Sequence, residues 1–277
     1  MSIWLKIQLP VHKLFKYIQF FDYYLEIFAK RLSGRGLMNP IKNGEYAVLE
    51  GVLLNKKTSV CFIDGGSNVG EHVMKFDFLC KKHGITNCSI LSVEPFPSTI
   101  EVLKRNLKNI SYELVNKALG KEIGTIKFFY PNDVNSSGQN SAFKHYYLSN
   151  SIEVEQTTVD MIIKDYSLDR VDFLKLDIEG AEYNALLGAK EALSKGLVDY
   201  IQLEYNQTWI EAGGTIQKVL SLAHSHSYEL YRIRKNNLLA ITKYDFNIED
   251  FTLCNLLLVR SGCALPLTSN RKASPLV

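Results

Sequence analysis

Residues 60–70, with the sequence VCFIDGGSNVG, are the segment that most restricts the fold of this chain. The first four residues are apolar and rich in β-branched and aromatic side chains, as in a strand buried on both faces of a parallel sheet. Gly65, Gly66 and Gly70 then permit a tight turn, close approach of the backbone to a ligand, and close packing of the next helix. The segment therefore predicts a strand, a turn and a helix of an α/β fold.

An acidic residue, Asp64, leads this turn, and the Gly-Lys-Ser/Thr sequence of a P-loop is absent, so a P-loop is disfavoured. A carboxylate there would repel a pyrophosphate but would favour a cationic ligand such as a sulfonium or an ammonium. A turn without any ligand is the alternative. We take Asp64, Asn68 and the three glycines as candidate ligand-binding residues.

A second predicted strand ends directly before Glu94. The two carboxylate oxygens of such a residue can accept both hydroxyl groups of a ribose. Pro95 belongs to the same strand end, and Phe96 can cover one face of a purine. A third strand is expected over residues 113–119, with Asn116 near its end as an adenine contact. An exposed Glu94 without a ligand is the alternative.

Residues 171–182, VDFLKLDIEGAE, again predict a strand, a tight turn and the start of a helix, which continues to Leu193. Asp177, Glu179 and Glu182 crowd the end of this strand, where open α/β sheets bind their ligands. Clustered acids repel one another, so they need a cation, a metal ion, hydrogen-bond donors or raised pKa values. Alternatively, these acids only interact favourably with the dipole of the following helix. That alternative would explain Glu179 and Glu182, but it explains Asp177 less well, because Asp177 lies at the end of the apolar strand.

The next strand, over residues 200–204, is expected to bring Glu204 to the same edge of the sheet. Residues 125–130 and 152–158 predict two further strands, antiparallel to each other and separated by a long polar loop. Because such loops are more often functional than not, we interpret this one as a mobile lid that shapes the acceptor site. His145 is a candidate acid or base within it. A disordered surface loop is the alternative.

Residues 1–50 differ in character from the rest of the chain. Apolar residues recur there at helical spacing, with further aromatic residues beside them and basic residues on both sides. We expect this helix to pack on the α/β domain or on a second subunit, because aromatic surfaces suit protein interfaces. An interfacial membrane helix is the alternative. Asp22 and Glu26 interrupt the run, so neither a membrane-spanning helix nor a secretory signal is expected.

The composition is that of an ordinary globular protein, with 46% apolar and 22% charged residues in a chain of 277. The formal charge of +3 is mild and the basic residues are spread along the chain, so no nucleic-acid footprint is visible. Five cysteines without a Cys-x-x-Cys pair argue against a disulfide framework or structural zinc, and they suggest reduced thiols in the cytoplasm.

Three segments of the chain resemble the motifs of FkbM-type S-adenosylmethionine-dependent methyltransferases. They are residues 62–70, residues 93–95, and residues 172–182 followed by Gly188 and Ala189. The third segment is the most specific. The resemblance implies a Rossmann-like class I methyltransferase fold, which is an α/β fold with a mostly parallel, twisted sheet and helices on both of its faces.

The resemblance does not extend to the two ends of the chain. We expect an N-terminal amphipathic helical extension over residues 1–50, the methyltransferase domain over residues 51–262, and a flexible tail over residues 263–277.

The resemblance also implies methyl transfer to a hydroxyl group of a sugar, a glycan or a secondary metabolite. The residues expected to bind S-adenosylmethionine are Asp64, Gly65, Gly66, Asn68, Gly70, Glu94, Pro95, Phe96 and Asn116. Asp177 or Glu204 would orient or deprotonate the acceptor, with His145 as a further catalytic candidate. Alternatively, Asp177, Glu179 and Glu204 would hold a divalent cation such as magnesium, for which oxygen ligands are suited.

Two other classes of function stay open. A nicotinamide-dependent oxidoreductase is disfavoured by Asp64 and by the absence of a strict Gly-x-Gly-x-x-Gly sequence. A non-catalytic Rossmann-like binding module would use the aromatic N-terminal helix to join a partner or a membrane. We expect a cytoplasmic protein with a small-molecule or glycan acceptor, and a homo-oligomer or a peripheral membrane contact formed through that helix.

Overall fold

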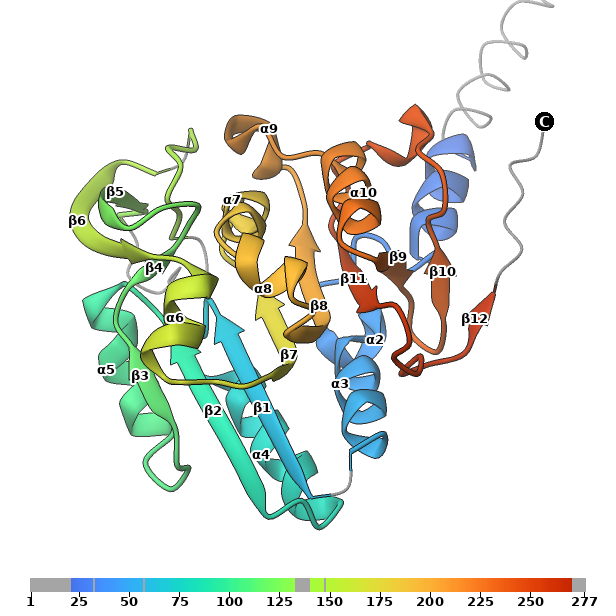
Figure 1. Ribbon diagram of the computed structural model, residues 1–277. Coiled ribbons are helices and arrows are strands. Elements are labelled where there is room, and N and C mark those ends of the chain that lie inside the picture. Colours follow the sequence, from blue (N-terminus) through green and yellow to red (C-terminus); the bar gives the residue numbers. More distant parts are fainter. Residues whose placement is uncertain (1–20, 32, 57, 133–139, 147, 271–277) are drawn as a thin grey trace, which may run out of the picture.

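The computed structural model describes residues 21–31, 33–56, 58–132, 140–146 and 148–270. A nine-stranded sheet runs through its centre, and a three-stranded sheet stands beside it (Figure 1). In spatial order, the large sheet consists of β12 (Ser269–Asn270), β10 (Leu238–Ala240), β9 (Tyr228–Ile233), β11 (Cys254–Arg260), β8 (Val198–Tyr205), β7 (Val171–Leu176), β1 (Ser59–Gly65), β2 (Asn87–Val93) and β3 (Glu113–Val115). The small sheet consists of β4 (Ala118–Leu119), β6 (Asn150–Thr157) and β5 (Gly124–Tyr130).

Five adjacent strands of the large sheet, from β8 through β7, β1 and β2 to β3, are parallel. β11 is antiparallel to both of its neighbours, β8 and β9. This is the mostly parallel α/β sheet that the sequence predicted, and the predicted antiparallel pair of β5 and β6 is confirmed as well. Because the parallel strands run in one direction, the turns that follow them all lie at one edge of the sheet.

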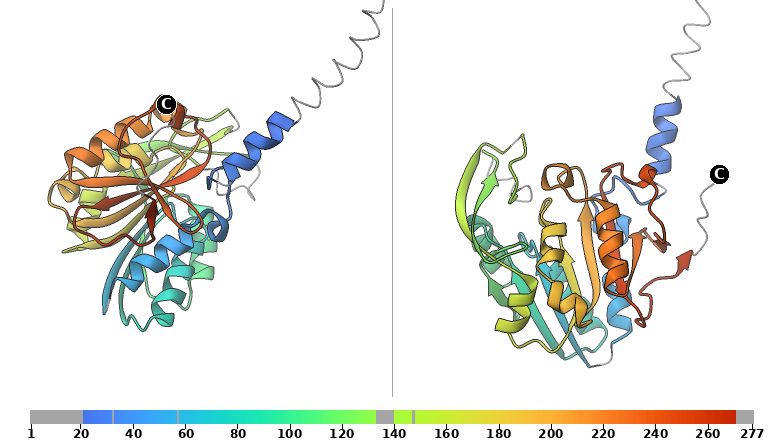
Figure 2. Two further views of the ribbon diagram at one scale, coloured as in Figure 1. Left: turned by 90° about the vertical axis from the view of Figure 1, so that its right-hand side faces the viewer. Right: turned by 45° about the horizontal axis from the view of Figure 1, so that its top comes forward.

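Helices cover both faces of the large sheet (Figures 1 and 2). On one face lie α3 (Glu45–Leu54), α4 (Glu71–Lys82) and α5 (Pro97–Asn106); on the other lie α6 (Val159–Asp165), α7 (Glu182–Leu187), α8 (Lys190–Ser194) and α10 (Ile216–Ser225). Each face has its own core of buried apolar residues, and alternate residues of β1 contribute to the two cores. Phe62 of β1 stacks on Phe76 and Phe173, with ring centroids 4.6 Å and 5.8 Å apart.

The single strand predicted over residues 113–119 is wrong, because the chain changes sheets within it. β3 pairs with β2, whereas β4 pairs with β6 of the small sheet. Between them the chain turns, and the Lys117 amide donates a hydrogen bond to the Val115 carbonyl (2.9 Å). Ala118 then packs against Phe128 of β5 in a small third core. Burial against the small sheet therefore draws the second half of the predicted strand away from the first.

The long helix predicted after residue 181 is also wrong, because it is divided into α7 and α8 at Gly188. A Cβ atom at Gly188 would lie 2.2 Å from the Gly120 carbonyl oxygen, so only glycine fits this close approach. The Asp160 amide donates to the Gly188 carbonyl, and the Asp160 carboxylate accepts hydrogen bonds from the amides of Glu191 and Ala192 (2.8 Å each). Contacts with α6 thus interrupt a helix whose apolar periodicity continues.

Residues 21–31 form a helix that projects away from both sheets (Figure 2). The apolar side chains of Phe21, Leu25 and Phe28 in this helix are 65%, 46% and 60% exposed. The prediction that the helix packs on the rest of its own chain is therefore wrong for residues 21–31. Residues 1–20 lie outside the described residues. Contact with a second subunit or with a membrane stays a prediction.

The helices in the described part of the chain include none with the length and apolarity needed to cross a membrane.

The two ends of the predicted domain also differ from the structure. α3 crosses the boundary expected at residue 50, and Val52 of this helix is fully buried against the sheet. The flexible tail predicted over residues 263–277 is wrong for residues 263–270, because β12 pairs with β10 and Leu267 packs on the core that contains α3. Residues 271–277 lie outside the described residues.

We expect Asp160→Ala to lower the free energy of unfolding by about 1–2 kcal/mol, because two amides at the start of α8 lose their carboxylate acceptor. Urea denaturation measures this loss. Asp165→Ala is the matched control, since Asp165 is an exposed acid of the same helix, α6. Equal destabilisation by the two substitutions would contradict the role given to Asp160.

Candidate functional site

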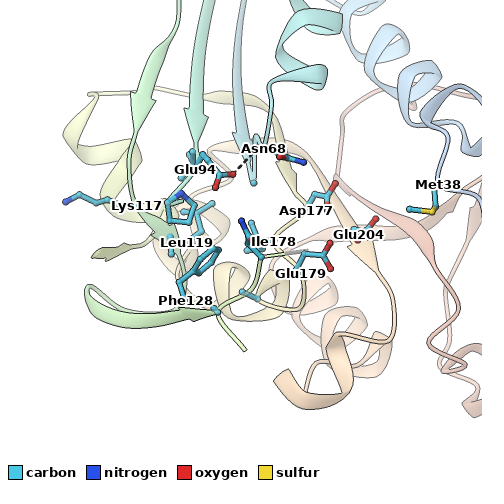
Figure 3. Close-up of a pocket in the computed structure, with 17 residues that line it drawn as sticks. Met38, Asn68, Glu94, Lys117, Leu119, Phe128, Asp177, Ile178, Glu179 and Glu204 are labelled. Carbon is cyan, nitrogen blue, oxygen red and sulfur yellow. Dashed lines mark hydrogen bonds between the residues drawn. The ribbon is translucent and has the colours of Figure 1, made fainter. Parts of the chain in front are cut away.

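A cavity opens at the carboxyl ends of β1, β2, β7 and β8, which is the predicted ligand-binding edge (Figure 3). It contains about 860 Å³ of space, counting the open solvent at its mouth. Its lining residues are Met38, Gly66, Asn68, Val93, Glu94, Pro95, Lys117, Ala118, Leu119, Phe128, Asn140, Ala142, Asp177, Ile178, Glu179, Ala181 and Glu204. The wall is therefore apolar near the small sheet and acidic near β7 and β8.

Glu94 lies at the tip of β2 and is 6% exposed. One of its carboxylate oxygens accepts a hydrogen bond from the Asn68 amide and the other accepts one from the Phe96 amide, both at 3.0 Å. These bonds fix the carboxylate against the first glycine turn, and its remaining lone pairs can serve a ligand in the cavity. Burial raises the pKa of Glu94 to about 7, although the two amide hydrogen bonds favour the charged form.

Three acids, two that follow β7 and one in β8, meet on another side of the cavity (Figure 3). Asp177 follows β7, Glu179 has a left-handed backbone (φ 50°) in the turn, and Glu204 lies in β8. One carboxylate oxygen of each acid lies within 4.8 Å of the other two. Burial, together with the charge of Asp177, raises the pKa values of Glu179 and Glu204 well above 4.5. This acid cluster can therefore keep a proton or hold a cation.

Lys175 places a buried positive charge beneath the acid cluster. Its side chain is 2% exposed, and Nζ lies 2.8 Å from Asp177 Oδ2 and 3.9 Å from Asp64 Oδ1. Burial by itself would lower the pKa of Lys175, but the charges of Asp177, Asp64 and Glu45 outweigh it and raise the pKa. The charged lysine therefore orients the Asp177 carboxylate and offsets part of the negative charge around it.

Glu45 of α3 extends this buried charge network, although no sequence pattern indicated it. Its carboxylate accepts a hydrogen bond from the Gln202 side chain (2.8 Å) and lies 3.1 Å from His72 Nε2. Burial acts in the opposite direction, but the hydrogen bond and charge of His72 lower the pKa of Glu45 to about 2. The network thus ties α3 and α4 to β7 and β8.

Asp64, which the sequence analysis expected to contact a cationic ligand, does not line the cavity. Its side chain is 1% exposed and lies near Lys175, and neither carboxylate oxygen has a hydrogen-bond partner among the described residues. The predicted contact is therefore wrong. Asp64 acts on the site through its charge, because it helps to keep Lys175 protonated.

The other predicted cofactor-binding residues divide into two groups. Gly66, Asn68, Glu94 and Pro95 line the cavity, and their contact with the cofactor stays a prediction. Gly65, Gly70, Phe96 and Asn116 do not line it.

The two glycines outside the cavity have structural roles instead. A Cβ atom at Gly65 would lie 2.7 Å from the Leu119 side chain, so this residue lets the small sheet approach the end of β1. Gly70 precedes α4 with a φ of 89°, a conformation that favours glycine.

Neighbouring residues take the places expected for Phe96 and Asn116. Phe96 packs on Tyr130, with ring centroids 5.0 Å apart, and Phe128 lines the cavity instead. Asn116 is exposed, whereas Lys117 lines the cavity. Both differences follow from the switch between β3 and β4, which turns the chain toward the small sheet.

His145, predicted as a catalytic acid or base, is 2% exposed and does not line the cavity. Its Nε2 lies 3.1 Å from Ser141 Oγ, and its Nδ1 lies 3.3 Å from Glu211 Oε2. Ser141 Oγ in turn donates to the Glu179 carbonyl (2.7 Å). His145 therefore supports the turn that carries Glu179. Residues 133–139 of the predicted lid lie outside the described residues.

Glu182 has a structural role, but it closes a turn and does not act through the dipole of α7, which was the alternative kept in the sequence analysis. Its carboxylate accepts hydrogen bonds from the amides of Ile178 (2.8 Å) and Gly180 (3.0 Å), which closes the turn before α7. Its side chain is almost fully buried, and burial raises its pKa to about 8. Glu182 thus shapes the turn between Asp177 and α7.

The sequence analysis missed Met38, Lys117, Phe128 and Asn140 as lining residues. Asn140 ends the polar loop that was interpreted as a lid, which is the only signal that pointed toward any of them. Its Nδ2 is buried and has no hydrogen-bond partner among the described residues, so a ligand can accept from it.

The chain matches the family model of the methyltransferase FkbM domain over residues 64–230. It is also similar to methyltransferase sdnD of Sordaria araneosa, with 24% identity over 213 residues. That alignment covers 66% of this chain and 78% of the Sordaria protein.

Two solved structures with S-adenosyl ligands are similar to this chain. The O-methyltransferase of Bacillus cereus in complex with SAH has 10% identity and a TM-score of 0.44, and the match covers 87% of this chain and 90% of that one. Fibrillarin of Aeropyrum pernix, with bound S-adenosyl-L-methionine, has 9% identity and a TM-score of 0.38, with 77% and 76% covered. At these identities the likeness concerns the fold alone.

The raised pKa of Glu94 predicts how stability depends on pH. Between pH 4.5 and about 7 the folded protein keeps a proton that the unfolded chain releases, so stability falls as pH rises through this window. Glu94→Gln removes this titration. We therefore expect the variant to gain up to about 3 kcal/mol relative to the wild type across the window, measured by urea denaturation at several pH values.

Glu101→Gln is the control for this experiment, because the Glu101 side chain is 71% exposed. Its unfolding free energy should follow that of the wild type at every pH. A Glu94→Gln curve parallel to the wild type would contradict the assignment of the titration to Glu94.

Proposed function

Because this chain belongs to the FkbM methyltransferase family, we propose that it transfers a methyl group from S-adenosylmethionine to a hydroxyl oxygen of a sugar, glycan or secondary-metabolite acceptor. The observation that carries the proposal is the position of Glu94 and the acid cluster in one cavity. The first suits a ribose, and the second suits a cationic methyl donor beside an acceptor that must lose a proton.

The residues present fit S-adenosylmethionine. Glu94 would accept hydrogen bonds from the ribose hydroxyls, and the apolar wall with Leu119 and Phe128 would take the adenine ring. The unpartnered Asn140 Nδ2 would donate to a polar atom of the ligand. Asp177 and Glu179 of the acid cluster would attract the ammonium and sulfonium charges.

S-adenosylmethionine supplies a methyl group that its sulfonium has already activated. The cavity therefore has to hold the acceptor oxygen in line with that methyl carbon, at roughly 3 Å, and exclude water. Glu204 is the general base: burial and the charges of the neighbouring acids raise its pKa, which makes its carboxylate a stronger proton acceptor, and Asn206 donates a hydrogen bond to one of its oxygens (2.7 Å). With S-adenosylmethionine bound, the acceptor oxygen would take the methyl group, S-adenosylhomocysteine would leave, and Glu204 would accept the hydroxyl proton.

Asp177 orients the acceptor, because its carboxylate is already held by Lys175 (2.8 Å). The neighbouring Glu179 lies in the same acid cluster. Alternatively, Asp177, Glu179 and Glu204 would bind a divalent cation through their carboxylate oxygens. Lys175 favours a direct role of the acids in orienting and deprotonating the acceptor, because it already supplies a positive charge to the cluster.

We place this activity in the cytoplasm. The five cysteines are all free, and Cys61, Cys80 and Cys254 are buried, as suits a reducing compartment.

Glu204→Gln should lower turnover by at least about 100-fold while the dissociation constant for S-adenosylmethionine changes less than about threefold, because the general base is lost and the ribose site is kept. Acceptors are first found by incubating glycan and metabolite extracts with the wild-type protein and S-adenosylmethionine. Mass spectrometry then detects the added methyl group, and isothermal titration measures binding.

Glu101→Gln, on the exposed face of α5, is the matched control and should leave both quantities unchanged. Turnover by Glu204→Gln within threefold of the wild type would remove Glu204 as the base. A wild-type protein that binds no S-adenosylmethionine would overturn the proposed function and favour a non-catalytic module.

Chelation tests whether the acid cluster acts without a metal ion or binds a divalent cation. We expect turnover to continue after treatment with EDTA, because Lys175 rather than a metal ion supplies the counter-charge. Loss of turnover that magnesium restores, together with weaker magnesium binding by Glu179→Gln, would assign the cluster to a divalent cation instead.

A further inference from the structure

We propose that the helix of residues 21–31 docks this protein on an anionic lipid bilayer surface. Phe21, Leu25 and Phe28 form its exposed apolar face, since positions separated by three, four and seven residues lie on one side of a helix. Asp22, Glu26 and Lys30 lie along another side of the helix, where Lys30 and Glu26 form an ion pair (2.7 Å). An amphipathic helix with an aromatic apolar face is suited to the boundary between headgroups and acyl chains.

The described residues outside the helix leave its exposed apolar face uncovered. In the part of the protein that the structure describes, none of the three apolar cores contains a residue of this helix. The helix projects from the domain in both views of Figure 2. Its base is nevertheless attached firmly, because Arg35 forms an ion pair with Asp250 and the Gly36 amide donates to the Leu253 carbonyl (2.7 Å).

The charge of the chain favours a lipid surface over a second copy of the protein as the partner of the exposed apolar face. Residues 1–35 contain six basic and two acidic residues, a net charge of +4. Because the whole chain carries +3, residues 36–277 carry −1. The positive charge is thus concentrated in the N-terminal part of the sequence, which contains the helix. Two such segments repel each other, whereas each basic residue near an anionic membrane adds to attraction.

The place where the helix joins the domain determines which part of the protein would face the membrane. The segment that follows the helix contributes Met38 to the wall of the cavity, so the helix leaves the domain near the edge of the sheet that carries the cavity (Figures 1 and 3). A helix in the plane of a bilayer would therefore hold this edge close to the membrane surface.

Vesicle flotation of the full chain tests the proposal. We expect the wild type to float with vesicles of phosphatidylcholine and phosphatidylglycerol, and to float less with phosphatidylcholine alone or at about 0.5 M salt, which screens the attraction. The triple variant Phe21→Ser, Leu25→Ser, Phe28→Ser should partition into the anionic vesicles at least about tenfold less. The matched control is Phe78→Ser, Ile210→Ser, Phe246→Ser, which removes three exposed apolar side chains elsewhere and should float like the wild type.

The outcomes distinguish binding to a lipid surface from association with a second copy of the protein. Failure of the wild type to float with anionic vesicles, or equal flotation of the two triple variants, would overturn the proposal. Sedimentation without vesicles detects the other occupant: a wild-type dimer that the Phe21, Leu25, Phe28 variant abolishes, without flotation, would make the face an interface between copies. Thermal unfolding and S-adenosylmethionine binding at wild-type values show that a variant is folded, as expected for exposed positions.

Discussion

The site depends on one buried positive charge, that of Lys175. A cation in the interior is stable only when opposite charges compensate its loss of hydration, and here Asp177 and Asp64 lie within 4 Å of its ammonium group. Glu45, tied to His72 and Gln202, adds a third negative charge from outside the sheet. Acids that would otherwise repel one another can therefore gather at the end of β7. Removing Lys175 would leave several buried carboxylates without compensation.

The backbone makes the same region close-packed. The Asp177 amide donates to the Gly65 carbonyl (3.0 Å), and a Cβ atom at Gly66 would lie 1.9 Å from the Asp177 carbonyl oxygen. The turns after β1 and β7 thus touch directly, which requires a glycine at position 66. This contact sets the distance between the side of the cavity that holds Glu94 and the side that holds the acid cluster. Loss of either turn would therefore disturb both halves of the site.

Sequence patterns anticipated which strand ends form the site but not every side chain in it. Glu94 and Asp177 were predicted correctly as neighbours of one cavity, because parallel strands end at one edge whatever their exact registers. Phe96 and Asn116 were not, since the switch between β3 and β4 gives their places to Phe128 and Lys117. His145 was misplaced for a similar reason: only the folded chain shows that Ser141 and Glu211 enclose it.

The sequence by itself determined the strand–turn–helix units, the family and the acidic ends of β2 and β7, because apolar periodicity and glycine positions are local properties. The tertiary structure alone decided which acids line the cavity. Asp64 turned inward toward Lys175, Glu182 closed a turn, and Glu204 remained in the cavity. It also decided that residues 21–31 stand apart from the domain. Burial and charge compensation depend on contacts between distant segments, and these exist only after the chain has folded.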